Sequence, residues 1–178
     1  RPFILSVWGS DIYLSPKKNI IYKSLIKRVI KSADHVCSTS LAMKKIISKD
    51  FNRHDCDLIP FGININKFIP KKVKNNFFNV GTIKSIESYN GIDCLINAAD
   101  IIINKMNYSN IKFIIVGKGS LLDEMKEKSR KLKLEKNIIF KGHIIHEKTI
   151  DYFQKLSVFI AVSTRESFGV SILEAGAC

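Results

Sequence analysis

An α/β fold built on parallel sheets is the class that this sequence predicts. Short apolar runs typical of buried strands alternate along the chain with longer segments whose apolar residues recur at helical spacing. The composition is that of an ordinary globular chain, with 178 residues, 46% hydrophobic and 25% charged. This composition excludes general disorder, and the apolar runs are too short for membrane-spanning helices. The length allows one ordinary domain or two incomplete ones.

The first part of the chain predicts three strands with helices between them. Strands are expected at 3–7, 35–37 and 57–60, and helical spacing of apolar residues covers 18–32. Ser40 is a typical N-cap for a further helix that runs through Ile47. A polar stretch rich in Lys and Asn follows, which predicts a linker at 69–76 between a first domain at 1–68 and a second at 77–178.

The second part repeats the strand–helix alternation. Strands are expected at 77–81, 111–116, 137–140 and 158–162, and helices at 92–105, 120–132, 147–156 and from 170 to the end. Strands that alternate with helices form parallel sheets with right-handed crossovers. Ligands of such sheets bind at the carboxyl ends of the strands, so the functional residues are expected in the loops that follow the strands.

The positive charge is large but diffuse. Residues 1–70 carry 12 basic and 5 acidic side chains, and the whole chain has 29 and 16, a net charge of +13. Diffuse positive charge fits a phosphorylated small substrate, an anionic membrane surface or nucleic acid. No RNA-binding or helix-turn-helix signature is present, so nucleic acid is not expected as the partner.

The four cysteines lie far apart in the sequence. Cys37, Cys56, Cys94 and Cys178 form no C-x-x-C pair, which favours reduced thiols and a cytoplasmic location. The two His-x-Cys pairs do not match the spacing of a zinc module, so no metal is expected.

Two of the loops after strands carry glycine and lysine. Gly117 and Gly119 stand between a strand and a helix, where glycine lets backbone N–H groups approach an anion. The alternative is an ordinary tight turn. Lys84 follows the strand that contains Gly81, and a lysine in that place can neutralise a diphosphate. The alternative is a solvated surface lysine.

The loop after the last predicted strand carries two carboxylates around a glycine turn. Glu166 precedes Gly169, and Glu174 lies about one turn inside the helix that follows. Carboxylates accept hydrogen bonds from hydroxyls, and a helix N-terminus attracts phosphate. This combination suits a sugar nucleotide, which has hydroxyls at both ends and a diphosphate between them. The alternative is that Glu166 merely favours the helix dipole and Glu174 is solvated.

The Glu166-x7-Glu174 pattern resembles the signature of retaining glycosyltransferases of the group 1 (family 4) type. Other segments resemble the same family in the same order, so that the similarity spans essentially the whole chain. These segments are Trp8-Gly9-Ser10-Asp11, Ala33-Asp34-His35-Val36, Ile59-Pro60-Phe61-Gly62-Ile63-Asn64, Gly91-Ile92-Asp93, Ile115-Val116-Gly117 and Ile139-Phe140 with Gly142.

The resemblance implies a GT-B fold, in which two Rossmann-like domains face each other, and both domains would be incomplete in this chain. A UDP- or GDP-linked sugar would bind the C-terminal domain and be transferred with retention of configuration, without a metal ion. Glu174 would bind the nucleotide ribose and Glu166 the transferred sugar. The remaining donor-binding residues implied are Gly81, Lys84, Gly117, His143, Ile144, Phe168, Gly169 and Val170, and Asp11 would face the acceptor and the reacting centre.

The sequence departs from the family at three positions. The usual Arg and Lys that clamp the diphosphate are replaced by Thr82 and Asn90, and Lys84 is the expected substitute. Trp8 stands where many members have a histidine, so a mechanism that needs that imidazole is not expected. The chain is also expected to be a fragment, because it begins inside the first domain and stops within the helix of Glu174.

The expected product is a cell-surface polysaccharide or a glycolipid, with a glycan or lipid-linked acceptor. A basic amphipathic helix at 17–31 could hold the protein on an anionic membrane surface on the cytoplasmic side. The commoner alternative for such a helix is a core-packed element with a solvated basic face. Two alternative functions remain for the chain, a non-catalytic nucleotide- or polyanion-binding module and a GT-B sugar-nucleotide epimerase.

Overall fold

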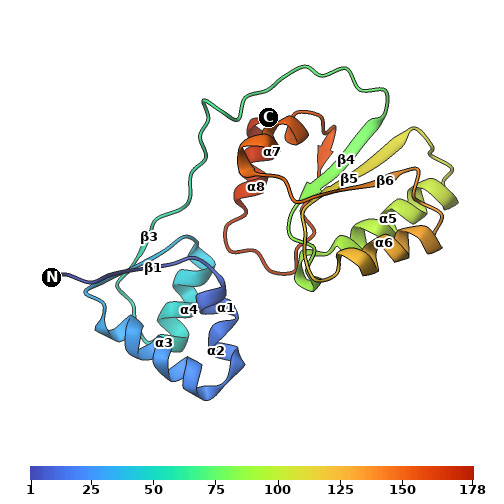
Figure 1. The fold of residues 1–178 in the computed structure, drawn as a ribbon. Coiled ribbons are helices and arrows are strands. Elements are labelled where there is room, and N and C mark those ends of the chain that lie inside the picture. The colour runs from blue at the N-terminus through green and yellow to red at the C-terminus, as the bar shows by residue number, and fades with distance from the viewer. The chain divides into compact units, whose positions relative to one another are not determined.

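The computed structural model describes residues 1–178, which form two compact units (Figure 1). The first unit comprises Arg1–Gly62 together with Glu166–Gly169, and the second comprises Ile63–Arg165 and Val170–Cys178. Each unit contains its own parallel β-sheet with helices packed against it. The α/β class predicted from the sequence is therefore confirmed.

The sheet of the first unit has three parallel strands in the order β1-β2-β3. The strands are β1 (Ile4–Val7), β2 (His35–Ser38) and β3 (Cys56–Leu58). The helices are α1 (Ser10–Tyr13), α2 (Ser15–Lys18), α3 (Ile20–Ser32) and α4 (Leu41–Phe51). The Ser40 hydroxyl accepts a hydrogen bond from the Met43 N–H, so Ser40 is the N-cap that the sequence predicts.

The core of the first unit is apolar and comes from both helices and strands. Val36 of β2 is fully buried and packs with the helical residues Ile30, Met43 and Ile47. These residues lie on the inward faces of α3 and α4, as their helical spacing predicts.

The sheet of the second unit has four parallel strands in the order β6-β5-β4-β7. Its strands are β4 (Phe78–Ile83), β5 (Ile111–Val116), β6 (Ile138–Gly142) and β7 (Val158–Phe159). Its helical segments are η1 (Ser88–Asn90), α5 (Ile92–Asp100), the π-helical turn η2 (Ile101–Lys105), α6 (Leu122–Lys131), α7 (His146–Phe153) and α8 (Val170–Ala177).

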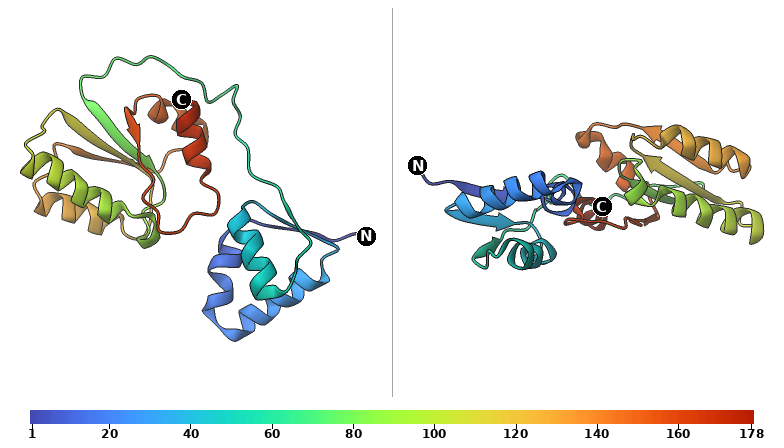
Figure 2. Two further views of the ribbon diagram at one scale, coloured as in Figure 1. Left: turned by 180° about the vertical axis from the view of Figure 1, so that it is seen from behind. Right: turned by 90° about the horizontal axis from the view of Figure 1, so that it is seen from below.

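The helices of the second unit form two groups around the sheet. Helices α5 and α6 run side by side along β4, β5 and β6, whereas α7 and α8 pack against each other on the β7 side (Figures 1 and 2). Leu95 and Ile96 of α5 are buried against Phe113 and Ile115 of β5. This topology places the loops after β4, β5 and β6 at one edge of the sheet.

Several elements differ from those predicted. The strand expected at 158–162 ends at Phe159, although Ile160 still donates a hydrogen bond to the Gly81 carbonyl at 2.8 Å. The helix expected at 92–105 changes to a π turn after Asp100. The short helices α1 and α2 were not expected, because each is only four residues long. Periodicity over so few residues carries almost no signal.

The segment that enters the second unit packs against it. Phe68 is buried, and its ring centroid lies 6.1 Å from that of Phe153. The units divide between Gly62 and Ile63, a little earlier in the chain than the boundary at residue 68 that the sequence suggested.

Candidate functional site

A pocket lies at the carboxyl ends of three neighbouring strands in the second unit. Its volume is about 360 Å³, which is within the usual range for small-molecule sites. The loops after β4, β5 and β6 supply its lining. The lining residues are Ile83, Lys84, Ser85, Val116, Gly117, Lys118, His143 and Ile144.

Four of the residues singled out in the sequence line this pocket together. They are Lys84 after β4, Gly117 after β5, and His143 and Ile144 after β6. Gly81 does not line it, because it lies within β4 and is buried. A Cβ at Gly81 would lie 2.6 Å from the Leu156 side chain, so the absence of a side chain there serves strand packing.

Backbone contacts hold the loops of the pocket against one another. The Lys84 N–H donates to the Val116 carbonyl at 2.9 Å, and the Gly117 N–H donates to the Gly142 carbonyl at 2.8 Å. Gly117 has a φ of 148°, and a Cβ built there would lie 1.8 Å from the Lys84 carbonyl oxygen. Only glycine fits this approach, so the pocket depends on Gly117 for its shape.

A partly exposed carboxylate that the sequence analysis did not single out, Glu87, holds the loop after β5. Glu87 accepts hydrogen bonds from the Ser120 N–H at 3.0 Å and from the Ser120 hydroxyl at 2.6 Å. These two bonds lower the pKa of Glu87 below its ordinary value, and the bond from the Ser120 hydroxyl has the larger effect. The Gly117–Ser120 loop is thus tied to the segment that follows Lys84.

The two positions where the family has its basic clamp serve a structural role here. Thr82 is buried within β4. Asn90 is also buried, and its amide donates to the carbonyl and the hydroxyl of Ser85, both at 2.8 Å. The Ser163 hydroxyl donates to Asn90 Oδ1 at 3.3 Å. The basic side chains at the pocket are therefore Lys84 and Lys118, and the sequence analysis named only the first of these.

Glu174 is 6% exposed, although it is an acidic residue on a short helix. Its Oε1 lies 2.7 Å from Nε2 of His146, the first residue of α7. The pKa of the nearby Cys178 thiol is raised, mainly by burial and also by the negative charge of Glu174. The sequence does not predict this role of His146, because no pattern links two residues that are 28 positions apart.

The remaining predicted residues divide between the two units. Glu166, Phe168 and Gly169 belong to the first unit, whereas Val170 begins α8 in the second unit. Gly169 has a φ of 83°, which confirms that glycine turns the chain before α8.

Asp11 belongs to the first unit, in the first turn of α1, the short helix that follows β1. Its carboxylate accepts hydrogen bonds from the N–H groups of Trp8 at 3.0 Å and Gly9 at 2.6 Å. The carboxylate therefore holds the turn that connects β1 to α1.

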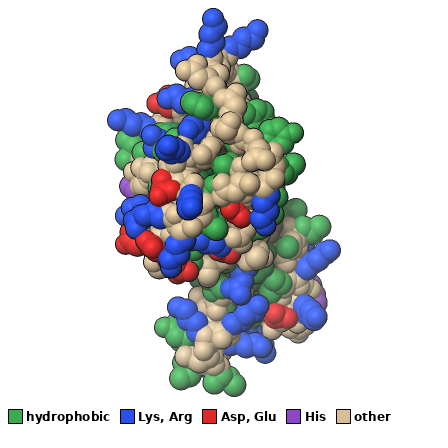
Figure 3. Space-filling model, turned by 90° about the vertical axis from the view of Figure 1, so that its right-hand side faces the viewer, with side chains coloured by type: hydrophobic (Ala, Val, Ile, Leu, Met, Phe, Trp, Pro, Cys, Tyr) green, Lys and Arg blue, Asp and Glu red, His purple; other side chains and the backbone are tan.

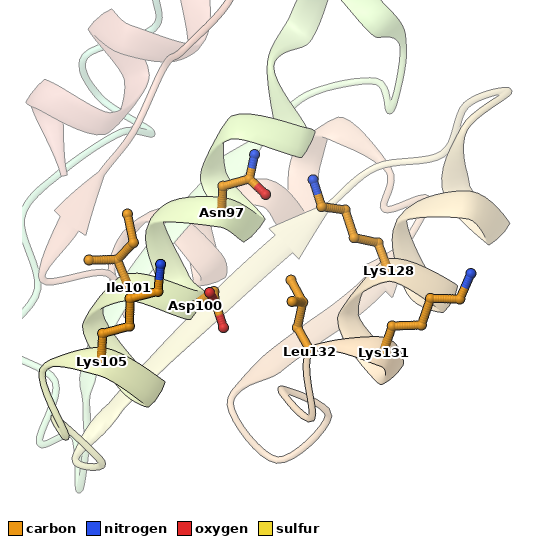
Figure 4. Close-up of a pocket in the computed structure, with 7 residues that line it drawn as sticks. All are labelled: Asn97, Asp100, Ile101, Lys105, Lys128, Lys131 and Leu132. Carbon is orange, nitrogen blue, oxygen red and sulfur yellow. The ribbon is translucent and has the colours of Figure 1, made fainter.

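A second hollow of the second unit lies on its helical surface, between α5 with η2 and α6 (Figure 4). Its lining mixes the basic Lys105, Lys128 and Lys131 with Asp100 and apolar side chains. Lys128 forms an ion pair with Asp93. This groove lies away from the strand ends, where parallel sheets bind ligands, so the pocket lined by Lys84 is the stronger candidate.

Basic side chains do not gather into one stripe on the face shown in Figure 3. Lysines and arginines are distributed over that face, with acidic side chains between them. A nucleic-acid interface concentrates its positive charge, so this face does not have the appearance of one.

The two parallel-sheet α/β units match the fold of GT-B glycosyltransferases. The structure of Anabaena HepE with UDP and glucose superposes with a TM-score of 0.84 at 19% identity, over all of this chain and 51% of that one. The structure of TarM from S. aureus has a TM-score of 0.81 at 20% identity, over 98% of this chain and 34% of that one.

Family models match both parts of the sequence. The model of glycosyl transferases group 1 covers residues 64–178, and that of glycosyl transferase 4-like proteins covers residues 1–40. The chain belongs to the group 1 glycosyl transferases. It is 24% identical to the alpha-monoglucosyldiacylglycerol synthase of Streptococcus pneumoniae over an alignment 172 residues long, which covers 85% of this chain and 37% of that protein. The chain thus spans about a third of the length of the curated relatives that it matches.

Proposed function

We propose that this chain carries the donor-binding part of a retaining glycosyltransferase that uses a UDP- or GDP-linked sugar. The proposal rests on one observation. A single pocket at the strand ends is lined by Lys84, Lys118, Gly117 and His143. Two lysines can neutralise a diphosphate, and glycine loops at strand ends let the backbone approach it. Glu174 of the same unit would accept hydrogen bonds from the ribose hydroxyls.

The relatives support this choice of substrates. The HepE structure contains UDP and glucose, and one TarM structure contains UDP and alpha-GlcNAc-glycerol. The streptococcal relative is named as a synthase of a glucosylated diacylglycerol. We infer that the acceptor is a glycan or a lipid-linked molecule, and that the product belongs to a cell-surface polysaccharide or a glycolipid.

The proposed reaction breaks the bond between the anomeric carbon and the diphosphate. The transition state resembles an oxocarbenium ion that leaves a negatively charged diphosphate. Lys84, Lys118 and the N-terminus of α8 would stabilise the developing negative charge without a metal ion. Glu166 would bind the transferred sugar, and Asp11 would lie at the acceptor. The leaving phosphate would take the proton of the acceptor hydroxyl, and the acceptor oxygen would bond to the anomeric carbon on the same face, which retains the configuration.

Replacing the two pocket lysines tests the proposal. We expect Lys84→Ala to weaken binding of UDP or GDP to this chain about tenfold, because Lys84 is half-buried at the pocket and a charge-assisted hydrogen bond to the diphosphate would be lost. Lys118→Ala should weaken it about threefold, because Lys118 is exposed. Lys131→Ala, on the α5–α6 groove, is the matched control and should leave binding unchanged. Isothermal titration calorimetry measures all three.

The same titrations separate the alternative functions. A polyanion-binding module would prefer nucleic acid to UDP and would lose affinity steeply with salt. Equal effects of Lys131→Ala and Lys84→Ala would likewise contradict the proposed site. A sugar-nucleotide epimerase would convert the donor in a full-length enzyme without consuming an acceptor, which product analysis detects.

We further propose that α3 rests on an anionic membrane surface on the cytoplasmic side. Its residues Ile20, Ile21 and Leu25 are exposed beside exposed basic side chains. These basic side chains are Lys17, Lys18, Lys23, Lys27, Arg28 and Lys31. An apolar groove of about 170 Å³ also follows the helix, lined partly by Leu25 and Val29. No helix of the structure combines the length and the hydrophobicity that crossing a bilayer requires.

Charge reversal on α3 tests the membrane proposal. We expect Lys23→Glu with Lys27→Glu to reduce co-sedimentation with anionic liposomes about tenfold or more, because each basic residue contributes about 1 kcal/mol near such a surface. Lys45→Glu with Lys49→Glu on α4 makes the same charge change elsewhere in the first unit and is the control. Binding that is insensitive to the anionic lipid content, or equal losses in both variants, would contradict docking through α3.

A further inference from the structure

The Glu174 carboxylate is almost fully buried and has His146 as its partner. Its Oε1 lies 2.7 Å from the His146 Nε2, and the side chains are 8% and 68% exposed, respectively. A carboxylate oxygen accepts hydrogen bonds, so the imidazole tautomer with its proton on Nε2 fits this contact. A buried charge without such a partner is strongly unfavourable. The contact therefore determines how the carboxylate is held on α8.

His146 is itself held from two sides. It begins α7, and its carbonyl accepts a hydrogen bond from the Thr149 hydroxyl at 2.7 Å. Its ring centroid lies 5.8 Å from that of Phe68, which is 6% exposed. Phe68 in turn contacts Phe153, at the other end of α7, with a centroid distance of 6.1 Å. The imidazole thus has a fixed backbone at one end and a buried aromatic ring beside it.

The contact with His146 engages one of the two carboxylate oxygens of Glu174, Oε1. Because Oε1 is engaged by His146, a ribose hydroxyl would be accepted by Oε2. A carboxylate that is fixed by one oxygen presents the other in a single direction. Fixing a binding group in advance lowers the entropy that is lost when the ligand binds.

We propose that His146 is a positioning residue for the ribose of the nucleotide donor. It acts through Glu174, holding Oε1 so that Oε2 faces the ribose hydroxyls. The proposal rests on the proposed nucleotide-sugar site, and it adds a residue that contributes to donor affinity and not to the chemical step. Phe68 supports the imidazole, so the segment that enters the second unit also contributes to ribose recognition.

Affinity for UDP and for its 2′,3′-dideoxy analogue tests the role of His146. We expect His146→Ala to weaken binding of UDP to the chain about tenfold, the size expected for a lost hydrogen bond to a charged group. The dideoxy analogue lacks the hydroxyls that Glu174 would bind, so its affinity should change less than twofold. His146→Gln should restore UDP affinity to within about threefold of wild type, because its amide can donate to Oε1. GDP and its dideoxy analogue replace UDP if the wild type prefers them.

The matched control is Lys148→Ala, which removes an exposed residue from the same helix and should leave both affinities unchanged. In a full-length enzyme that contains this chain, His146→Ala should raise the donor KM about tenfold with kcat nearly unchanged. Equal weakening of UDP and its dideoxy analogue, or no rescue by glutamine, would show a merely structural role and overturn the inference. If the wild-type chain discriminates UDP from its analogue but His146→Ala also does, the positioning role fails while the nucleotide site stands. If the wild type binds neither UDP nor GDP, the proposed function itself fails.

Discussion

Replacement of Glu166 by alanine in a full-length enzyme that contains this chain should lower kcat by about 10²–10³-fold. The proposed role of this carboxylate is to bind the transferred sugar while positive charge develops on its ring. Loss of one group that stabilises charge in a transition state typically has an effect of this size. Glu166 is exposed in the loop between β7 and α8, so the melting temperature should hardly change.

Glu124→Ala is the control for this experiment, because Glu124 is also an exposed carboxylate of the second part of the chain and lies in the first turn of α6. It should keep wild-type kcat and wild-type stability. If Glu166→Ala were to retain activity near that of wild type, the role assigned to Glu166 would be wrong. If its activity and melting temperature fell together, the loss would reflect unfolding.

Gly117→Ala should destabilise the protein by about 3–5 kcal/mol, a size reached only by substitutions with a specific steric cause. The added Cβ would lie 1.8 Å from the Lys84 carbonyl oxygen, and the φ of 148° is one that residues with a side chain rarely adopt. Lys84 cannot easily move away, because its own N–H is bonded to the Val116 carbonyl. Urea denaturation gives the change in the free energy of unfolding.

Gly176→Ala provides the contrast for Gly117→Ala. A Cβ at Gly176 meets no atom within 4 Å, and the residue lies within α8. Alanine there should leave stability unchanged or raise it by up to about 1 kcal/mol, since glycine disfavours helices. If Gly117→Ala unfolded at the same urea concentration as wild type, the close contact between the loops after β4 and β5 would be contradicted.

The fold could be predicted from the sequence because its strongest signals are local. Apolar runs such as 111–116 became β5 with the same bounds, and the Ser40 cap was recognisable from one side chain. The pocket could be predicted in part, because the carboxyl ends of parallel strands meet at one edge of a sheet. Lys84 and Gly117 were singled out for this reason, whereas His143 and Ile144 were expected only from the resemblance to the family.

The rest of the site depends on contacts that leave no pattern in the sequence. His146 reaches Glu174 from 28 residues away, and Glu87 reaches Ser120 from 33 residues away. Lys118 carries no signal of its own in the sequence, because an isolated lysine is usually a solvated surface residue. Asn90 stands where the family usually has a lysine, and only its hydrogen bonds with Ser85 and Ser163 show that it holds loops together.

NMR titration of the isotope-labelled chain with UDP and GDP tests most directly whether the strand-end pocket holds a nucleotide diphosphate. The account predicts saturable changes in the amide signals of Lys84, Gly117, Lys118 and Ile144, together with those around Glu174 in α8. Changes confined to the walls of the α5–α6 groove, at 97–105 and 128–132, would contradict it. So would the absence of any saturable change at the strand ends with either nucleotide.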